Sequence, residues 1–131
     1  METTTTFPDI DPKDIGKHVF DAGWYEGEIN RLEVTLTTEG DQFGVPGDKS
    51  LRLVAMLDAA NGKQQFDERF QFQGAGAWKC SMVSKGLGLR GNADLTAYNG
   101  VKVRMEFKDP RKADDGRTFN SLARIMLAGD A

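Results

Sequence analysis

Hydrophobic residues alternate with polar residues over several short stretches of the chain, and each stretch predicts a β-strand. The first covers residues 24–38, and the second covers residues 51–57 with leucine at every other position except 55. In the third, Phe66, Phe70 and Phe72 share one face. Between the second and third stretches, Asn61-Gly62 predicts a hairpin with a type I′ turn, because this dipeptide readily adopts positive φ angles.

Alternation resumes near the C-terminus after the turn residues Asn99-Gly100. The fourth strand is predicted over residues 101–108, with Val101, Val103, Met105 and Phe107 inward. A polar loop at residues 109–117 then leads to a last strand over residues 118–127.

Between Gly74 and Gly88 the spacing of apolar residues changes from two to about 3.6, which predicts a helix. Its apolar stripe comprises Trp78, Met82, Val83 and Leu87. We therefore expect Trp78 to lie in the core. Gly86 or Gly88 supplies the helix end.

The first strand changes phase in its middle. Tyr25 and Ile29 occupy odd positions, whereas the apolar residues that follow, at 32, 34 and 36, occupy even ones. A regular strand would send these two sets to opposite faces. One extra residue near Asn30 or Arg31, a β-bulge, would return both sets to one core and bend the strand.

The order of elements is three strands, one helix and two strands. It predicts a mainly β protein, a five-stranded Greek-key barrel of the oligonucleotide-binding (OB) type with one helix between strands 3 and 4. Other α+β arrangements share this order. Residues 1–22, with four consecutive threonines and two prolines, form a partly ordered N-terminal arm, and residues 23–131 form the single domain.

Composition narrows the class of protein. A chain of 131 residues fits one domain. It has no apolar run of membrane-spanning length and no signal-peptide pattern, and its single cysteine agrees with a reducing cytosol. The net charge is −3, but residues 1–50 hold 4 basic and 11 acidic side chains while residues 51–131 hold 13 and 9. This asymmetry is compatible with a cationic surface on the later elements.

The residues that could form a catalytic or metal-binding site do not occur in the patterns that such sites require. His18 is the only histidine and Cys80 the only cysteine, so neither a hydrolytic triad nor a zinc site is indicated. Residues 86–91 match G-x-G-x-x-G, but at the end of a helix rather than before one, which indicates a helix stop. The acidic residues at 109, 114 and 115 lack the spacing of a calcium loop. We expect no enzyme activity, no cofactor and no metal.

With catalysis and metal binding not indicated, the remaining candidate is a surface that binds a ligand. An OB fold holds its ligand across strands 2 and 3, between the loops that join strands 1 to 2 and 4 to 5. Cationic groups there attract phosphates and aromatic rings stack on bases. The candidate residues are Lys49, Arg52, Arg69, Arg111, Lys112 and Arg117 for phosphates, and Phe43 and Tyr98 for stacking. As alternatives, Arg52 and Arg69 pair with Asp67 or Asp58 across the hairpin, and Phe43 folds back onto the barrel.

With these elements placed, the segment Gly23-Trp24-Tyr25-Glu26-Gly27-Glu28-Ile29 resembles the opening of a family of short bacteriophage proteins. The resemblance continues through the Leu-rich and Phe-rich strands, the helix with its Cys, and the spacing of Asp94-Leu95, Gly100 and Val103, to Asn120 in the last strand. It implies an OB fold and single-stranded DNA binding near phage replication and recombination. The chain departs from many single-strand binders in its weak basic character and in lacking an acidic C-terminal end.

The sequence therefore predicts sequence-tolerant binding of single-stranded DNA in the host cytosol, with phage replication or recombination proteins as further partners and a homodimer as an open alternative. The rival hypothesis is a protein-binding module, such as a structural, inhibitor or recombinase-partner protein, that uses a strand edge or the acidic N-terminal arm.

Overall fold

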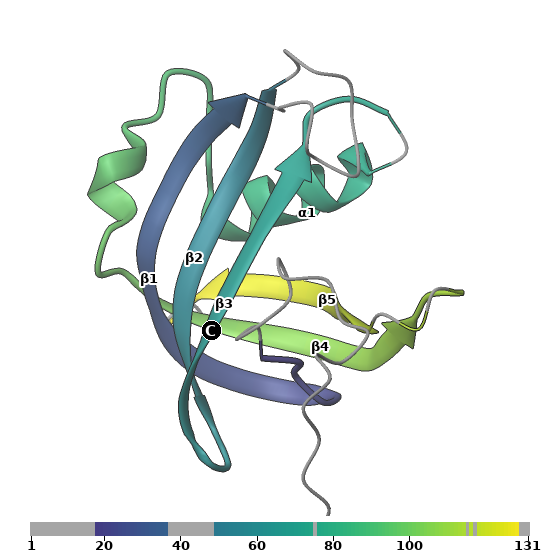
Figure 1. Cartoon of the computed structure of the whole chain (residues 1–131). Helices are drawn as coiled ribbons and strands as arrows, with labels where there is room; N and C mark the ends of the chain where they lie inside the picture. The colour runs from purple at the N-terminus through teal and green to yellow at the C-terminus, as the bar shows by residue number, and fades with distance from the viewer. Residues whose placement is uncertain (1–17, 37–48, 75, 115, 117, 129–131) are drawn as a thin grey trace, which may run out of the picture.

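The computed structural model describes residues 18–36, 49–74, 76–114, 116 and 118–128. Within these ranges five antiparallel strands form one sheet in the order β3-β2-β1-β4-β5 (Figure 1). The strands are β1 (Gly23–Leu36), β2 (Lys49–Ala59), β3 (Gly62–Gln71), β4 (Lys102–Lys112) and β5 (Thr118–Leu127). The helix α1 (Ala77–Leu87) follows β3, and the short 3-10 helix η2 (Leu95–Tyr98) precedes β4. The mainly β fold with its helix between strands 3 and 4 is confirmed.

The long first strand bends and serves both halves of the sheet. Residues 23–28 of β1 pair with β4, and residues 27–36 pair with β2. The register with β2 shifts between Ile29 and Arg31, so Asn30 is the extra residue and the predicted bulge is confirmed. Ile29 and Leu32, on either side of it, are both buried. The prediction that Val34 and Leu36 share this core is wrong, because both are largely exposed towards the end of the strand.

The expected closed barrel is not formed. The edges of the sheet are β3 and β5, and no recorded pairing joins them over the residues described. Instead α1 packs against both edge strands (Figure 1). A Cβ added at Gly86 would overlap the carbonyl oxygen of Ile125, so the helix backbone lies directly on β5. The helix thus connects the two free edges by packing rather than by strand pairing.

The helix buries only part of the apolar stripe that its spacing predicted: Val83 and Leu87 are buried and Met82 packs against the core, but Trp78 does not. Its buried residues are Cys80, Val83 and Leu87, whereas Trp78 is 61% exposed. The prediction that Trp78 lies in the core is wrong, since it is on the opposite side of the helix from this buried stripe. Gly88, with φ of 70°, ends the helix in the left-handed conformation, which confirms the interpretation of G-x-G-x-x-G as a helix stop.

The β2–β3 hairpin is confirmed, but its turn is not the one predicted. Ala59 pairs with Gly62, so Ala60 and Asn61 form the two-residue turn. Gly62 has a φ of 110°, whereas Asn61 is not among the residues with positive φ. A type I′ turn needs positive φ at both central residues, and the prediction of that turn type is wrong.

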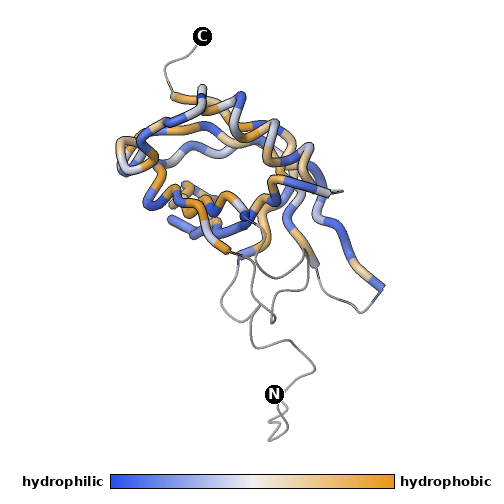
Figure 2. Tube along the Cα trace, turned by 90° about the horizontal axis from the view of Figure 1, so that it is seen from above, coloured by the Kyte–Doolittle hydropathy of each residue, from blue (hydrophilic) through white to orange (hydrophobic). Residues whose placement is uncertain are grey.

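Aromatic rings fill the core on the inner side of the curved sheet. Phe20, from the segment before β1, is fully buried and stacks on Phe107 with ring centroids 4.9 Å apart. The rings of Tyr25 and Phe66 pack around this pair. Seen from above, hydrophobic and hydrophilic residues alternate along the strands (Figure 2), as a sheet with one core face requires.

Asn120 of β5 fixes the chain on either side of Val19. Its Oδ1 accepts a hydrogen bond of 2.7 Å from the backbone N–H of Phe20, and its Nδ2 donates to the carbonyl of His18 at 3.1 Å. The side-chain amide thereby satisfies the backbone groups of His18 and Phe20 that a neighbouring strand would otherwise bond, and it holds Phe20 in the core.

No helix among the residues described is long and apolar enough to cross a membrane.

The close contact at Gly86 gives a test of the helix position. In an ordinary helix, Gly→Ala stabilises by about 1 kcal/mol. Here we expect Gly86→Ala to lower the free energy of unfolding by about 1–3 kcal/mol, because the new Cβ meets the backbone of Ile125. Gly91→Ala is the control, since a Cβ there meets nothing within 4 Å. Urea denaturation of both variants measures the difference, and a stabilised Gly86→Ala protein would contradict this packing.

Candidate nucleic-acid interface

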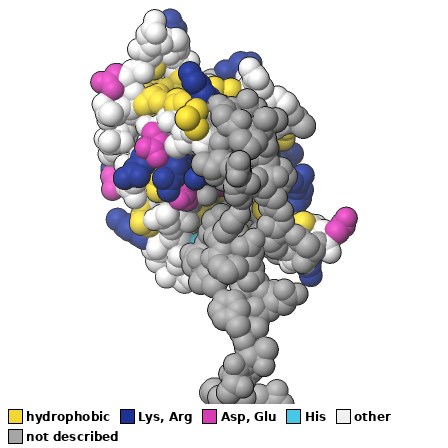
Figure 3. Space-filling view, turned by 45° about the horizontal axis from the view of Figure 1, so that its top comes forward, with side chains coloured by type: hydrophobic (Ala, Val, Ile, Leu, Met, Phe, Trp, Pro, Cys, Tyr) yellow, Lys and Arg dark blue, Asp and Glu magenta, His cyan; other side chains and the backbone are white. Residues whose placement is uncertain are grey.

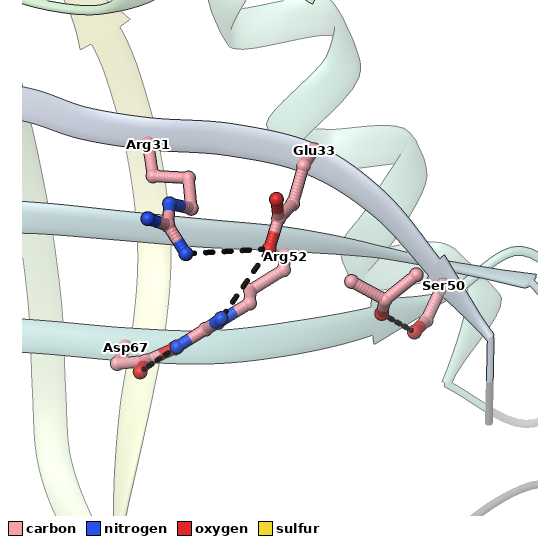
Figure 4. Close-up of polar contacts among 6 residues, drawn as sticks. Arg31, Glu33, Ser50, Arg52 and Asp67 are labelled. Carbon is pink, nitrogen blue, oxygen red and sulfur yellow. Dashed lines mark hydrogen bonds and ion pairs between the residues drawn. The ribbon is translucent and has the colours of Figure 1, made fainter. Parts of the chain in front are cut away.

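Arg52, the central cation of the predicted site, lies in an ion-pair network on the sheet face away from α1 (Figure 4). Its Nε and Nη2 donate to the two carboxylate oxygens of Asp67 at 3.1 and 2.8 Å. Its Nη1 lies 3.3 Å from Oε1 of Glu33, which also contacts Arg31 at 3.9 Å. Glu33 comes from β1, Arg52 from β2 and Asp67 from β3, and the pairing of these neighbouring strands brings the three side chains together.

This network neutralises Arg52. The hydrogen bond to Asp67 is the main reason that the pKa of Arg52 is raised, with Glu33 adding to it. The guanidinium already makes a two-pronged contact with one carboxylate, the geometry that it would otherwise offer to a phosphate. The alternative in which Arg52 pairs with Asp67 across the hairpin is therefore confirmed.

Of the other predicted residues that the structure describes, Arg69 lies beside Arg52 and the rest lie elsewhere on the fold. Lys49 is exposed at the start of β2, and Arg69 is exposed on β3 directly opposite Arg52. Arg111 and Lys112 are exposed near the end of β4, which projects beyond the rest of the sheet (Figure 1). Phe43 and Arg117 lie outside the described residues. The structure therefore does not gather the described cations into one groove.

Tyr98, the second predicted stacking residue, is engaged in packing. Its ring is partly buried against the core, and its hydroxyl donates a 2.8 Å hydrogen bond to the carbonyl of Leu87. This bond fastens η2 to the end of α1.

The other half of the sheet also pairs its charges. On β1 and β4, Glu28 lies 3.1 Å from Lys102, and Glu26 lies 3.6 Å from Arg104. Glu106 and Arg124 form a third pair at 3.3 Å across β4 and β5. In the view of Figure 3, basic side chains likewise lie beside acidic ones rather than forming an unbroken basic surface. These pairs are exposed and each contributes about 0–1 kcal/mol.

A different surface, which the sequence interpretation missed, lies where β1 and β3 end. Lys49 lies opposite Leu36 in the β1–β2 register. The carbonyl of Lys49 accepts a hydrogen bond from the N–H of Phe72. Leu36 and Phe72 are exposed by 59% and 43%. The helix begins five residues after Phe72, and its first turn presents Trp78 to solvent. The sequence did contain a signal for this arrangement. Cys80, Val83 and Leu87, spaced three and four residues apart, share one helix face, and residue 78 lies on the opposite face.

This surface adjoins a segment without acidic residues. Residues 69–93 contain Arg69, Lys79, Lys85 and Arg90 but no aspartate or glutamate. Over the described part of the chain, none of the recorded ion pairs involves Lys79, Lys85 or Arg90. The segment includes the end of β3, all of α1 and the turn after it. It is a local excess of positive charge in a chain whose net charge is −3.

The two residues considered for catalysis are part of the packing. Cys80 is buried, and this burial raises the pKa of its thiol. The ring of His18 packs edge-on against Phe20 at 4.5 Å. Over the described ranges, no group of three or more His, Cys, Asp or Glu side chains could hold a metal ion.

Thr35 and Ser50 form a further polar contact across β1 and β2, at 3.1 Å between their hydroxyls (Figure 4). Ser50 is almost fully buried, so this hydrogen bond satisfies a polar group that would otherwise destabilise the sheet.

Comparison of the chain with protein-family models, with curated proteins and with solved structures gave no match. The observed features define an open, five-stranded antiparallel sheet with one helix across its free edges and paired charges on its outer face. Among the residues described, Lys79, Lys85 and Arg90, on and after the helix, take part in none of these ion pairs.

The Arg52 network predicts a stability difference between two similar substitutions. Asp67→Asn removes the charge that holds Arg52, and because the pair is partly buried we expect a loss of about 1 kcal/mol. Glu28→Gln removes the more exposed partner of Lys102 and should cost less than about 0.5 kcal/mol. Denaturant unfolding at low and high salt measures both. Equal losses would show that the Arg52 network contributes no more than an ordinary surface pair.

Proposed function

We propose that the protein binds single-stranded DNA through an OB-type fold, in phage replication or recombination and without catalysing a reaction. An OB fold is a five-stranded, partly open Greek-key barrel. Five antiparallel strands with both free edges packed on one helix are compatible with an opened form of that barrel. The resemblance of residues 23–29 and the later motifs to a phage single-strand-binding family supports the choice of ligand.

The observation that carries the proposal is the acid-free cationic segment at residues 69–93. A lysine or arginine that neutralises a phosphate releases a bound counterion, and this release drives binding to nucleic acid. Lys85 and Arg90 are exposed and have no recorded carboxylate partner in the described ranges, so they can do this without first breaking an ion pair. Arg52 would have to leave Asp67 and Glu33. We therefore assign the phosphate contacts mainly to the α1 side rather than to Arg52.

Salt dependence tests the proposal with the full chain. Fluorescence anisotropy with a labelled oligo-dT of about 20 nucleotides should give an affinity that falls roughly 20-fold between about 50 and 200 mM salt, if about three phosphates are contacted. A duplex of the same length should compete weakly. Absence of binding at the lower salt concentration would refute the proposal, and binding that does not change with salt would favour the protein-binding module instead.

Charge neutralisation tests the location of the phosphate contacts. Lys85→Gln and Arg90→Gln should each make the log–log salt slope shallower by about 0.7, because each removes one counterion-releasing contact. Lys102→Gln is the matched control, since this exposed lysine is paired with Glu28 on the other half of the sheet. An equal change in all three variants would indicate a general charge effect rather than a site.

A further inference from the structure

Trp78 is unusual because a large apolar ring lies on the water-facing side of a short helix. The buried stripe of Cys80, Val83 and Leu87 accounts for the packing of α1 without it. Lys85, two turns further along, lies on the same outer face as Trp78. An exposed ring of this kind provides a flat apolar surface to a ligand.

A second exposed aromatic residue precedes this helix by five positions. Phe72 follows β3 directly and is 43% exposed. At the start of the helix, the N–H of Ala77 donates to the carbonyl of Gly74 and that of Lys79 to the carbonyl of Gly76. A Cβ added at Gly76 would lie 3.9 Å from Oε1 of Gln71, so the start of α1 stands beside the end of β3.

Cations accompany both rings. The Nζ of Lys79 lies 5.6 Å from the centre of the Trp78 ring, and Lys49 is bonded through its backbone to Phe72. Phe72, Trp78 and Lys79 all lie within residues 69–93, which include no aspartate or glutamate. Aromatic faces combined with positive charge are complementary to a flexible ligand that carries both flat bases and phosphates.

We infer that Trp78 and Phe72 form a base-stacking platform for single-stranded DNA, with Lys79 and Lys49 at the adjoining phosphates. This inference rests on the proposed function and adds the residues that recognise bases. It also supplies a physical reason for preferring single strands, because the bases of a duplex are already stacked on one another and cannot present their faces.

Trp24 provides a matched control within the same chain. It is the only other tryptophan, and it is also exposed, at 42%. Its ring lies 5.4 Å from the guanidinium of Arg104, which is itself paired with Glu26. The two tryptophans thus differ in their electrostatic surroundings more than in their exposure.

Affinity measurements compare the two positions directly. Trp78→Ala should weaken oligo-dT binding roughly 5- to 150-fold, the range for losing one stacked base. Trp78→Phe should recover part of that loss, and Trp24→Ala should change affinity less than about twofold. Because Trp78 is exposed, circular dichroism should show that Trp78→Ala retains its fold. An oligonucleotide of the same length without bases should bind wild-type protein and Trp78→Ala equally, since only phosphates remain.

Fluorescence gives an independent readout. In a Trp24→Phe protein, Trp78 is the only tryptophan, and its emission should be quenched by oligo-dT over the same concentrations as the anisotropy change. In a Trp78→Phe protein the emission of Trp24 should stay constant. If wild type and Trp78→Ala bind oligo-dT with equal affinity and equal salt slope, the stacking platform is refuted while the proposed function stands. If neither protein binds at low salt, the proposed function itself is refuted.

Discussion

The bend in β1 is the constraint on which the rest of the structure depends. One strand pairs with β4 at its start and with β2 at its end, and Gly27 and Glu28 pair with both. A Cβ at Gly27 would overlap the carbonyl oxygen of Met56, so only glycine permits β2 to approach so closely there. The bulge at Asn30 then returns Leu32 to the side of Ile29. Without these two features the strands would form a flatter sheet, and the hydrophobic residues of β1 would face opposite sides.

A curved sheet that does not close has to fill its inner side with residues from elsewhere. Phe20 enters from before β1 and stacks on Phe107, while α1 covers the space between the free edges of β3 and β5. Both additions depend on β5: Asn120 binds the backbone at Phe20, and Ile125 lies under Gly86. The last strand therefore holds together two parts of the chain that are distant in sequence, through the side chain of Asn120 and the backbone of Ile125 rather than through strand pairing with β3.

The sequence predicted what depends on local periodicity. Strand alternation predicted the β2–β3 hairpin and the inward positions Val103, Met105 and Phe107, and the change of phase predicted the bulge. Features that depend on contacts between residues far apart in the sequence could not be predicted from it. The face of α1 that is buried is decided by β3 and β5, and the apolar character of Trp78 led to its wrong assignment to that face. The availability of Arg52 depends on cross-strand register with Glu33 and Asp67, and Phe20 belongs to a segment too short to show any period.

Charge in this chain is better described by its pairing than by its sum. A net charge of −3 would oppose binding to a polyanion if the acidic groups were spread evenly. Among the residues described, Glu26, Glu28, Glu33, Asp67 and Glu106 are each paired with a cation on the outer face of the sheet, so these five carboxylates are neutralised locally. Screening reduces the reach of exposed charges to about 10 Å at moderate salt, so a phosphate at α1 would respond mainly to Lys79, Lys85 and Arg90. Nucleic-acid binding by an acidic protein is therefore physically consistent when the carboxylates are neutralised away from the site, and the composition of the whole chain is a poor guide to the ligand of one face.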